Sequence, residues 1–219
     1  MVAGVVDTYK RLVGFDEASL ILASRKGDLD AFNQLVLNYQ SMIYNLAERI
    51  LGDSDAADDI TQDTFLTAYL NLPRFRNGSF RSWLYRIATN ACYDVHRQQK
   101  RHPVFSIEKE IIEDQKLKPV FNTPGSSSLP EVEFDRHELS RIIQQALNQL
   151  EVDQRMVISL VDLQDFDYQE AAQILAIPVG TVKSRLARAR LRLRHLLGTS
   201  GFSPGAPLPA EPISSSAMS

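Results

Sequence analysis

Residues 167–197 read DYQEAAQILAIPVGTVKSRLARARLRLRHLL, and this segment is the most informative about how the second half of the chain folds. Asp167 and Glu170 have the spacing of a capping box, which predicts the start of a short helix. A tight connection at Ala176–Ile177 follows, and Pro178 suits the first position of the next helix because no N–H is needed there. A short helix, a tight turn and a long basic helix together predict a helix-turn-helix.

The long helix of this motif carries six basic residues and no acidic one between residues 183 and 194. A helix face that meets only water normally mixes both signs, because opposite charges four residues apart stabilise each other. Contact with DNA phosphates explains a helix without acids better than a solvated face does. The basic residues are Lys183, Arg185, Arg188, Arg190, Arg192 and Arg194.

Along the whole chain, apolar residues recur at helical spacing over about residues 20–95 and 134–197, and strand signals are almost absent. The pattern predicts an all-α fold. Three amphipathic helices are expected in the first of these blocks. Gly52 ends one of them, Ser54 is predicted to cap the next, and another opens near Ser79.

The chain is therefore expected to form two small helical domains joined by a flexible linker. Residues 17–102 are predicted to form an N-terminal helical bundle, and residues 134–197 are predicted to form the C-terminal helix-turn-helix domain. Within the second domain, Asp153 is predicted to cap a helix. Residues 103–133 contain prolines and a Gly-Ser-Ser-Ser run, which is typical of a linker. Residues 198–219 hold too little apolar surface to order themselves, which predicts a disordered tail.

Composition excludes several classes of protein. The 219 residues include a single cysteine, Cys92, so no intramolecular disulfide can form, and the four histidines lack the spacing of zinc ligands. We expect neither a metal nor another cofactor. No apolar run approaches the roughly 20 residues of a membrane span, which predicts a cytoplasmic chain without membrane insertion. A net charge of −3 predicts no polyanion partner, but the charges are unevenly distributed.

Five aspartates lie between residues 53 and 63 without a basic residue among them. The helix macrodipole favours acids near the start of a helix, which accounts for some of them. Asp59 and Asp63, however, lie four residues apart beyond the first turn, with Gln62 beside them. Such a stripe repels DNA, so a basic protein partner is the better explanation.

The opposite sign dominates residues 74–101, where seven basic residues and five aromatic residues accompany one acid, Asp94. Aromatic rings among basic side chains suit single-stranded DNA, since unstacked bases can lie on the rings while the backbone is neutralised. Some rings must belong to the core. Phe80 and Trp83 keep helical spacing with Ile87, which favours a structural role for Trp83.

Three motifs, which follow one another along the chain, resemble conserved regions of bacterial RNA polymerase sigma factors. The resemblance is to the extracytoplasmic function (ECF) group of the sigma-70 family. DDITQDTF at residues 58–65 resembles the polymerase-binding helix of the second conserved region. FRSWLYRIATN at residues 80–90 resembles the minus-ten helix. YQEAA at 168–172, followed by PVGTVKSR at 178–185, resembles the fourth region.

The resemblance implies a transcription initiation factor without catalytic residues. It would bind core RNA polymerase, recognise and open the minus-ten promoter element and bind the minus-thirty-five element, and an anti-sigma factor is a further expected partner. The implied polymerase-binding residues are Asp58, Asp59, Gln62, Asp63 and Phe65. The implied minus-ten residues are Phe75, Arg76, Asn77, Arg86, Asn90, Asp94 and Arg97. The implied minus-thirty-five residues are Thr181, Lys183, Ser184, Arg185, Arg188 and Arg190.

In this scheme Asn90 helps to read a base extruded from the stack, because an amide offers both a donor and an acceptor to a base edge. Phe75 and the Arg76–Gly78 loop would wall the pocket of that base. The loop is shorter than the commoner form in the family, and Ala187 stands where relatives can carry a bulky aromatic residue. The base preference therefore stays open.

Two other classes share part of the pattern. A repressor or activator would also contain a helix-turn-helix, but it needs neither the acidic stripe nor the aromatic-basic helix. A serine recombinase needs a nucleophilic serine on an α/β domain, and the first block predicts no strands. The acidic excess in the linker allows either a passage through a nucleic-acid channel of the polymerase or a plain solvated tether.

Overall fold

The computed structural model describes residues 16–76, 78–101 and 130–199, and within these ranges the secondary structure is helical, without a strand. The predicted all-α fold is confirmed. The linker up to residue 129, the tail from residue 200 and Asn77 lie outside the described residues, so the predictions for them keep that status. Among the described helices, none combines the length and apolar character needed to cross a membrane.

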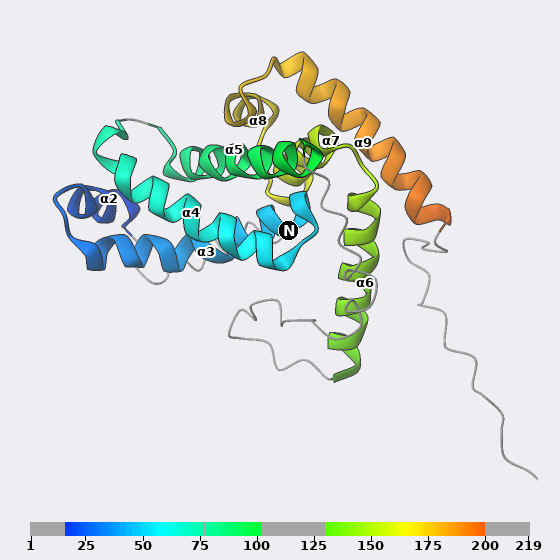
Figure 1. Cartoon of the computed structure of the whole chain (residues 1–219), viewed down its shortest axis with the longest axis horizontal. Helices are drawn as coiled ribbons and strands as arrows, with labels where there is room; N and C mark the ends of the chain where they lie inside the picture. Colours follow the sequence, from blue (N-terminus) through cyan, green and yellow to red (C-terminus); the bar gives the residue numbers. More distant parts are fainter. Residues whose placement is uncertain (1–15, 77, 102–129, 200–219) are drawn as a thin grey trace, which may run out of the picture.

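The first block is a bundle of four α-helices (Figure 1). Gly52 ends the second of them, as predicted, and the structure adds that it adopts the left-handed conformation, at φ 70°. The predicted cap at Ser54 is wrong: the Asp53 carboxylate accepts the N–H groups of Asp55 and Ala56, and Ser54 is the first helical residue. The helices are α2 (Glu17–Arg25), α3 (Leu29–Leu51), α4 (Ser54–Asn71) and α5 (Phe80–Arg101), with a short 3₁₀ turn, η1 (Leu72–Arg74), after α4.

The second block contains the predicted helix-turn-helix. The capping box of Asp167 and Glu170 is present, and Ala176 makes the turn in the left-handed conformation, at φ 52°. Its elements are α6 (Pro130–Asn148), α7 (Val152–Ile158), the π-turn η2 (Ser159–Leu163), α8 (Tyr168–Leu175) and α9 (Val179–Thr199).

Two predicted boundaries of this block are wrong. Helix α6 starts at Pro130, inside the segment assigned to the linker, because a proline is tolerated in the first turn of a helix. Asp153 does not cap α7, which begins after Glu151 without a side-chain cap. The Asp153 carboxylate instead pairs with Arg185 of α9 at 2.7 Å.

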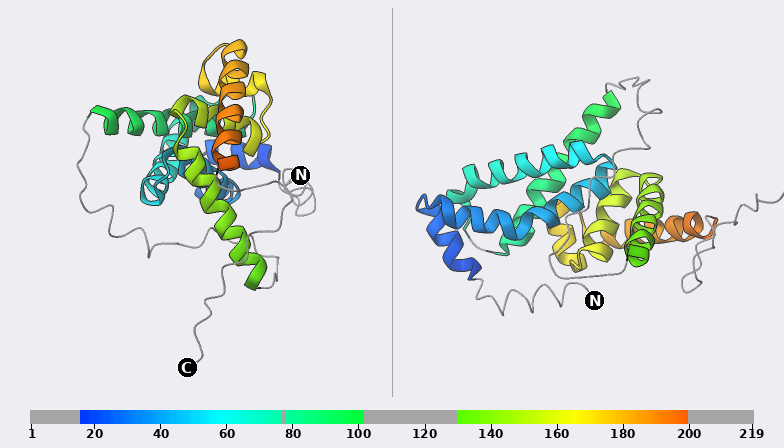
Figure 2. Two further views of the ribbon diagram at one scale, coloured as in Figure 1. Left: turned by 90° about the vertical axis from the view of Figure 1, so that its right-hand side faces the viewer. Right: turned by 90° about the horizontal axis from the view of Figure 1, so that it is seen from below.

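The two blocks pack against each other through one continuous apolar core. In the first block α3, α4 and α5 lie side by side, and their buried side chains include Leu35, Ile43 and Leu84. Helix α6 crosses the end of α3, and α8 lies against α5 (Figures 1 and 2). The described parts of the two predicted domains are thus in direct contact, which the sequence pattern did not predict.

Candidate nucleic-acid interface

The acidic stripe of α4 faces outward. Asp59, Gln62 and Asp63 are exposed, and Asp58 is half-buried at its edge. Neither Asp59 nor Asp63 has an ion pair among the residues that the structure describes. The stripe is thus a free negative surface, as expected for a site that binds a basic partner.

Phe65 does not belong to this surface. Its side chain is only 7% exposed and lies in the core of the first block, so it cannot contact a partner while the bundle is intact. The prediction for Phe65 is therefore wrong as a direct contact. Leu66 and Leu70, which are 58% and 67% exposed, extend the stripe by one and two turns instead. They follow Asp63 at helical spacing along the same helix, and this spacing was the signal that could have revealed them.

The polar face of α5 carries four of the predicted minus-ten residues. Arg86, Asn90, Asp94 and Arg97 are all exposed, at helical spacing that places them on one side. The opposite side of α5 is buried in the core of the bundle. The helix therefore presents two guanidinium groups, one amide and one carboxylate to an approaching ligand from a rigid support.

Three aromatic rings pack together near the start of α5, beside this polar face. Phe75 and Trp83 lie with ring centroids 5.0 Å apart, and each also packs on Phe80, at 5.7 and 5.6 Å. Trp83 is half-buried against the core, as its helical spacing predicts. Phe75 is also half-buried, so its ring can offer only part of its surface to a base.

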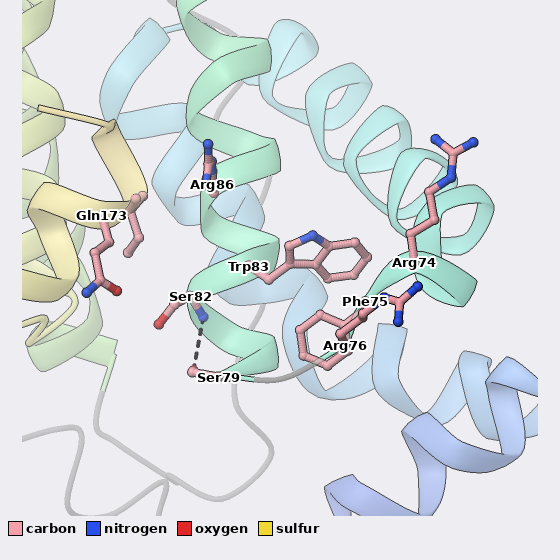
Figure 3. Close-up of a pocket in the computed structure, with 10 residues that line it drawn as sticks. Arg74, Phe75, Arg76, Ser79, Ser82, Trp83, Arg86 and Gln173 are labelled. Atoms are coloured by element: carbon pink, nitrogen blue, oxygen red, sulfur yellow. Dashed lines mark hydrogen bonds between the residues drawn. The ribbon is translucent and has the colours of Figure 1, made fainter.

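A cavity of about 310 Å³ opens beside these rings (Figure 3). Its lining combines three guanidinium groups with the two aromatic rings, which suits a negatively charged ligand with a flat apolar part. Helix α8 of the second block contributes Gln173 and Ile174 to the opposite wall. The lining residues from the first block are Arg74, Phe75, Arg76, Gly78, Ser79, Ser82, Trp83 and Arg86.

One basic residue of this region points elsewhere. The Arg81 guanidinium donates to the backbone carbonyl of Gln164 and lies 4.1 Å from the ring centroid of Phe166, both in the second block. Its charge is engaged within the protein. Arg81 therefore contributes less to the basic surface than the charge count of the sequence suggests.

The recognition helix α9 exposes three of its predicted base-reading side chains, Lys183, Ser184 and Arg188. Thr181 is half-buried near the start of the helix, where its carbonyl accepts the hydroxyl of Ser184 at 3.0 Å. Arg188 Nε donates to the Ser184 carbonyl at 3.3 Å. The exposed face of the first two turns is therefore polar, positive and free for a DNA groove.

Arg185 and Arg190, also assigned to the minus-thirty-five site, already have carboxylate partners. Arg185 pairs with Asp153 of α7 at 2.7 Å, and Arg190 forms two hydrogen bonds with Asp162 of η2. These hydrogen bonds raise the pKa of the Arg190 guanidinium. Because α9 lacks acids, the sequence suggested free charges, but the acids come from other elements. Both arginines hold α9 in place.

Comparison with known proteins identifies the family of both blocks. The Sigma-70 region 2 family model matches residues 35–102, and the Sigma-70, region 4 model matches residues 140–193. The chain is 40% identical over 174 residues to the ECF RNA polymerase sigma factor SigW of Bacillus subtilis, covering 79% of this chain and 92% of that protein. It is 36% identical over 183 residues to the ECF RNA polymerase sigma factor SigM of Mycobacterium tuberculosis, covering 83% and 85%.

Two solved structures match across both blocks. The sigma factor RpoE in complex with the anti-sigma factor NepR from Bartonella quintana is 32% identical, with a TM-score of 0.57, over 76% of this chain and 96% of that one. CnrH in complex with the cytosolic domain of CnrY is 27% identical, with a TM-score of 0.59, over 82% and 96%.

Proposed function

This chain belongs to the sigma-70 family, as a sigma factor of the ECF group that directs promoter recognition and transcription initiation, and we propose how its surfaces divide this task. Sigma factors are not enzymes, and we assign no catalytic residue to this one. We place its action in the cytoplasm, with core RNA polymerase and promoter DNA as partners. The functional units are the helical bundle up to Arg101 and the helix-turn-helix block from Pro130.

The exposed stripe of α4 is the proposed contact with core polymerase. Asp59, Gln62 and Asp63 supply charge and hydrogen-bond acceptors, and Leu66 adds an exposed apolar surface at the same side of the helix. A basic helix of the polymerase fits both properties. Asp58 borders this contact, and Phe65 supports it from the core.

The polar face of α5 and the adjoining cavity are the proposed minus-ten site. Arg86 and Arg97 neutralise the DNA backbone, while Asn90 reads a base edge. The cavity beside Phe75, Arg76 and Trp83 receives an extruded base, which costs a few kcal/mol of unstacking that the pocket must return. Asp94 is the acid of this face and accepts from the exocyclic amine of a base. Asn77 lies outside the described residues and stays a minus-ten residue proposed from the sequence alone.

The first two turns of α9 are the proposed minus-thirty-five site. Lys183, Ser184 and Arg188 are exposed where a recognition helix reaches base edges in the major groove. Thr181, near the start of α9, is proposed to lie where this helix enters the major groove of the DNA. Arg185 and Arg190 keep the helix at its angle through Asp153 and Asp162, and their exposed parts add positive potential near phosphates.

The observation that carries this assignment is the exposure of the Arg86–Asn90–Arg97 face on a helix buried along its other side. The test is transcription with purified core polymerase, with the transcript start mapped. We expect Asn90→Ala to reduce initiation about 5- to 150-fold, as for the loss of a bidentate base contact of about 1–3 kcal/mol. The matched control is Gln98→Ala, an exposed amide farther along α5.

Binding to duplex DNA separates the alternatives. A repressor shifts its duplex alone, whereas a sigma factor needs core polymerase to hold both of its DNA-binding surfaces. Equal initiation by the Asn90 and Gln98 variants would contradict the assigned minus-ten site. An anti-sigma factor is a further proposed partner, because one matched relative is solved in complex with such a protein.

A further inference from the structure

The two ion pairs of the recognition helix α9 lie at opposite edges of its buried face. At about 100° per residue, the side chains of Arg185 and Arg190 point about 140° apart around the helix axis. The directions of the buried residues Val182, Leu186 and Ala189 fall between them. Each arginine therefore leaves the helix at one border between its buried and its exposed face.

The carboxylates of both pairs come from other elements of the same block. Asp153 of α7 lies 2.7 Å from Arg185, and the two side chains are 36% and 26% exposed. Asp162 of η2 accepts two hydrogen bonds from Arg190, at 2.9 and 2.6 Å, and these bonds raise the pKa of that guanidinium. Because neither acid belongs to α9, the sequence of the helix gives no sign that two of its charges are balanced.

The remaining basic side chains of the helix are all exposed. Among the residues that the structure describes, none of them has a carboxylate partner within ion-pair distance. Two of the six positive charges between residues 183 and 194 are thus balanced inside the protein, and four are offered to DNA. The four are Lys183, Arg188, Arg192 and Arg194.

The edges of a recognition helix are the places where phosphates lie. A helix in the major groove has one sugar-phosphate strand on each side. Contacts to phosphates release counterions and supply nearly all of the affinity for non-specific duplex. An arginine that is already paired gains little from a phosphate, because the pair as a whole is neutral. The two pairs therefore remove one phosphate contact at each edge and leave the exposed Lys183, Ser184 and Arg188 unchanged.

We propose that Asp153 and Asp162 are specificity determinants that keep the free factor off non-promoter duplex DNA, by balancing the charges of Arg185 and Arg190. The consequence for transcription rests on the proposed function: a factor that bulk duplex does not retain stays available to core polymerase. A purely structural role of the two pairs predicts something else. In that case neutralising the acids loosens α9 and brings no gain in DNA binding.

The first test is Asp153→Asn combined with Asp162→Asn in the full-length protein, without polymerase. Anisotropy of a fluorescent duplex that lacks promoter elements measures binding over a range of salt concentrations. Each released arginine that reaches a phosphate should steepen the slope of log K against log salt by about 0.9, so by about 1.8 for both. The advantage of the variant over the native protein should then grow about 12-fold from about 200 to about 50 mM salt. Equal slopes would overturn the proposal.

The matched control separates the pairs from net charge. Glu151→Gln with Asp165→Asn removes two exposed acids of the same block, so the net charge changes by the same amount. We expect this control to keep the native slope, and the same steepening in both variants would refute the role of the pairs. Asp153→Glu with Asp162→Glu retains both negative charges and should also keep the native slope.

A variant with four changes tests whether the arginines cause the gain. Arg185→Gln and Arg190→Gln, added to the two asparagine changes, restore the net charge of the native protein and should restore its slope. A slope that stays steep would show that other residues bind the phosphates. If the double asparagine variant loses helix content by circular dichroism, Asp162→Asn alone replaces it, with an expected steepening of about 0.9.

Competition connects the charge balance to polymerase. An excess of non-promoter duplex should lower the apparent affinity of the double asparagine variant for core polymerase more than that of the native protein. Equal effects on both would contradict the stated consequence. The proposed function fails on a different result, namely unchanged initiation by Asn90→Ala. The duplex measurement contains no polymerase and no promoter, so that failure leaves its outcome in place.

Discussion

The guanidinium of Arg190 and the carboxylate of Asp162 share two hydrogen bonds, of 2.9 and 2.6 Å, although the residues lie 28 positions apart. The pair ties the middle of the recognition helix α9 to η2. Because two nitrogens and both oxygens are used, the geometry of the pair also restricts the rotation of α9. This contact gives an arginine of a DNA-binding helix a role inside its own block.

Loss of either partner should have the same small effect on stability. We expect Arg190→Ala, Asp162→Ala and the double variant each to lower the free energy of unfolding by about 0.2–1 kcal/mol, because the pair is partly exposed. Urea unfolding of the four proteins measures this. Additive losses in the double variant would show that the two residues act independently.

The two halves of α9 should differ in what they do to DNA. Arg188→Ala should change which minus-thirty-five bases are preferred, at a cost of about 1–3 kcal/mol at the affected position. Arg194→Ala should weaken all promoters alike and flatten the salt dependence, since it lies late on the helix where only phosphate is within reach. Binding of holoenzyme to a randomised promoter library compares them. Identical base-preference profiles would contradict this division.

The acidic stripe should be required for holoenzyme assembly. Reversal of its charge with Asp59→Lys and Asp63→Lys should abolish co-purification with core polymerase, because like charges would then face the basic partner. The fold should survive, since both side chains are exposed. Asp30→Lys, an exposed acid in the first turn of α3, is the control for a single Asp59→Lys change. Retained co-purification of the double variant would exclude the stripe as the contact.

The close approach of the blocks should make Gly52 sensitive to substitution. A Cβ at this position would clash with the side-chain amide of Asn148, and φ is 70°. Gly52→Ala should therefore cost about 1 kcal/mol for the left-handed backbone and a further amount for the clash. In an Asn148→Ala background only the backbone cost should remain. Thermal unfolding of the four proteins compares these costs, and an equal loss in both backgrounds would show that the Asn148 side chain moves aside at little cost.

Alkaline conditions should weaken the contact between the Tyr85 hydroxyl of α5 and Gln164, which follows η2. Burial raises its pKa from 10.0 to about 12, so the folded protein holds this proton more tightly than the unfolded chain. The resulting stabilisation is complete below pH 10 and is lost as the pH rises toward 12, by about 2–3 kcal/mol at most. Urea unfolding of the protein and of Tyr85→Phe between about pH 9 and pH 12 checks this. The variant should show the shallower decline, and parallel curves would contradict the assignment.

The sequence alone determined the helices and most of their exposed faces. A capping box, a tight turn after the short helix and the stop at Gly52 depend on contacts within a few residues, so the local pattern is sufficient to predict them. Helical spacing likewise separates the exposed Asp59, Asp63 and Asn90 from the core residues beside them. These predictions needed no knowledge of how the helices pack.

Which of the charged and aromatic residues are free to bind a partner depends on how the helices pack. Phe65 lies next to the acidic stripe in sequence, but its direction on α4 places it in the core. The partners of Arg81, Arg155 and Arg190 come from other parts of the chain, 28 to 105 residues away, and no periodicity along one helix encodes such distances. The contact between the two blocks is of the same kind, because it depends on side chains that meet only after both have folded.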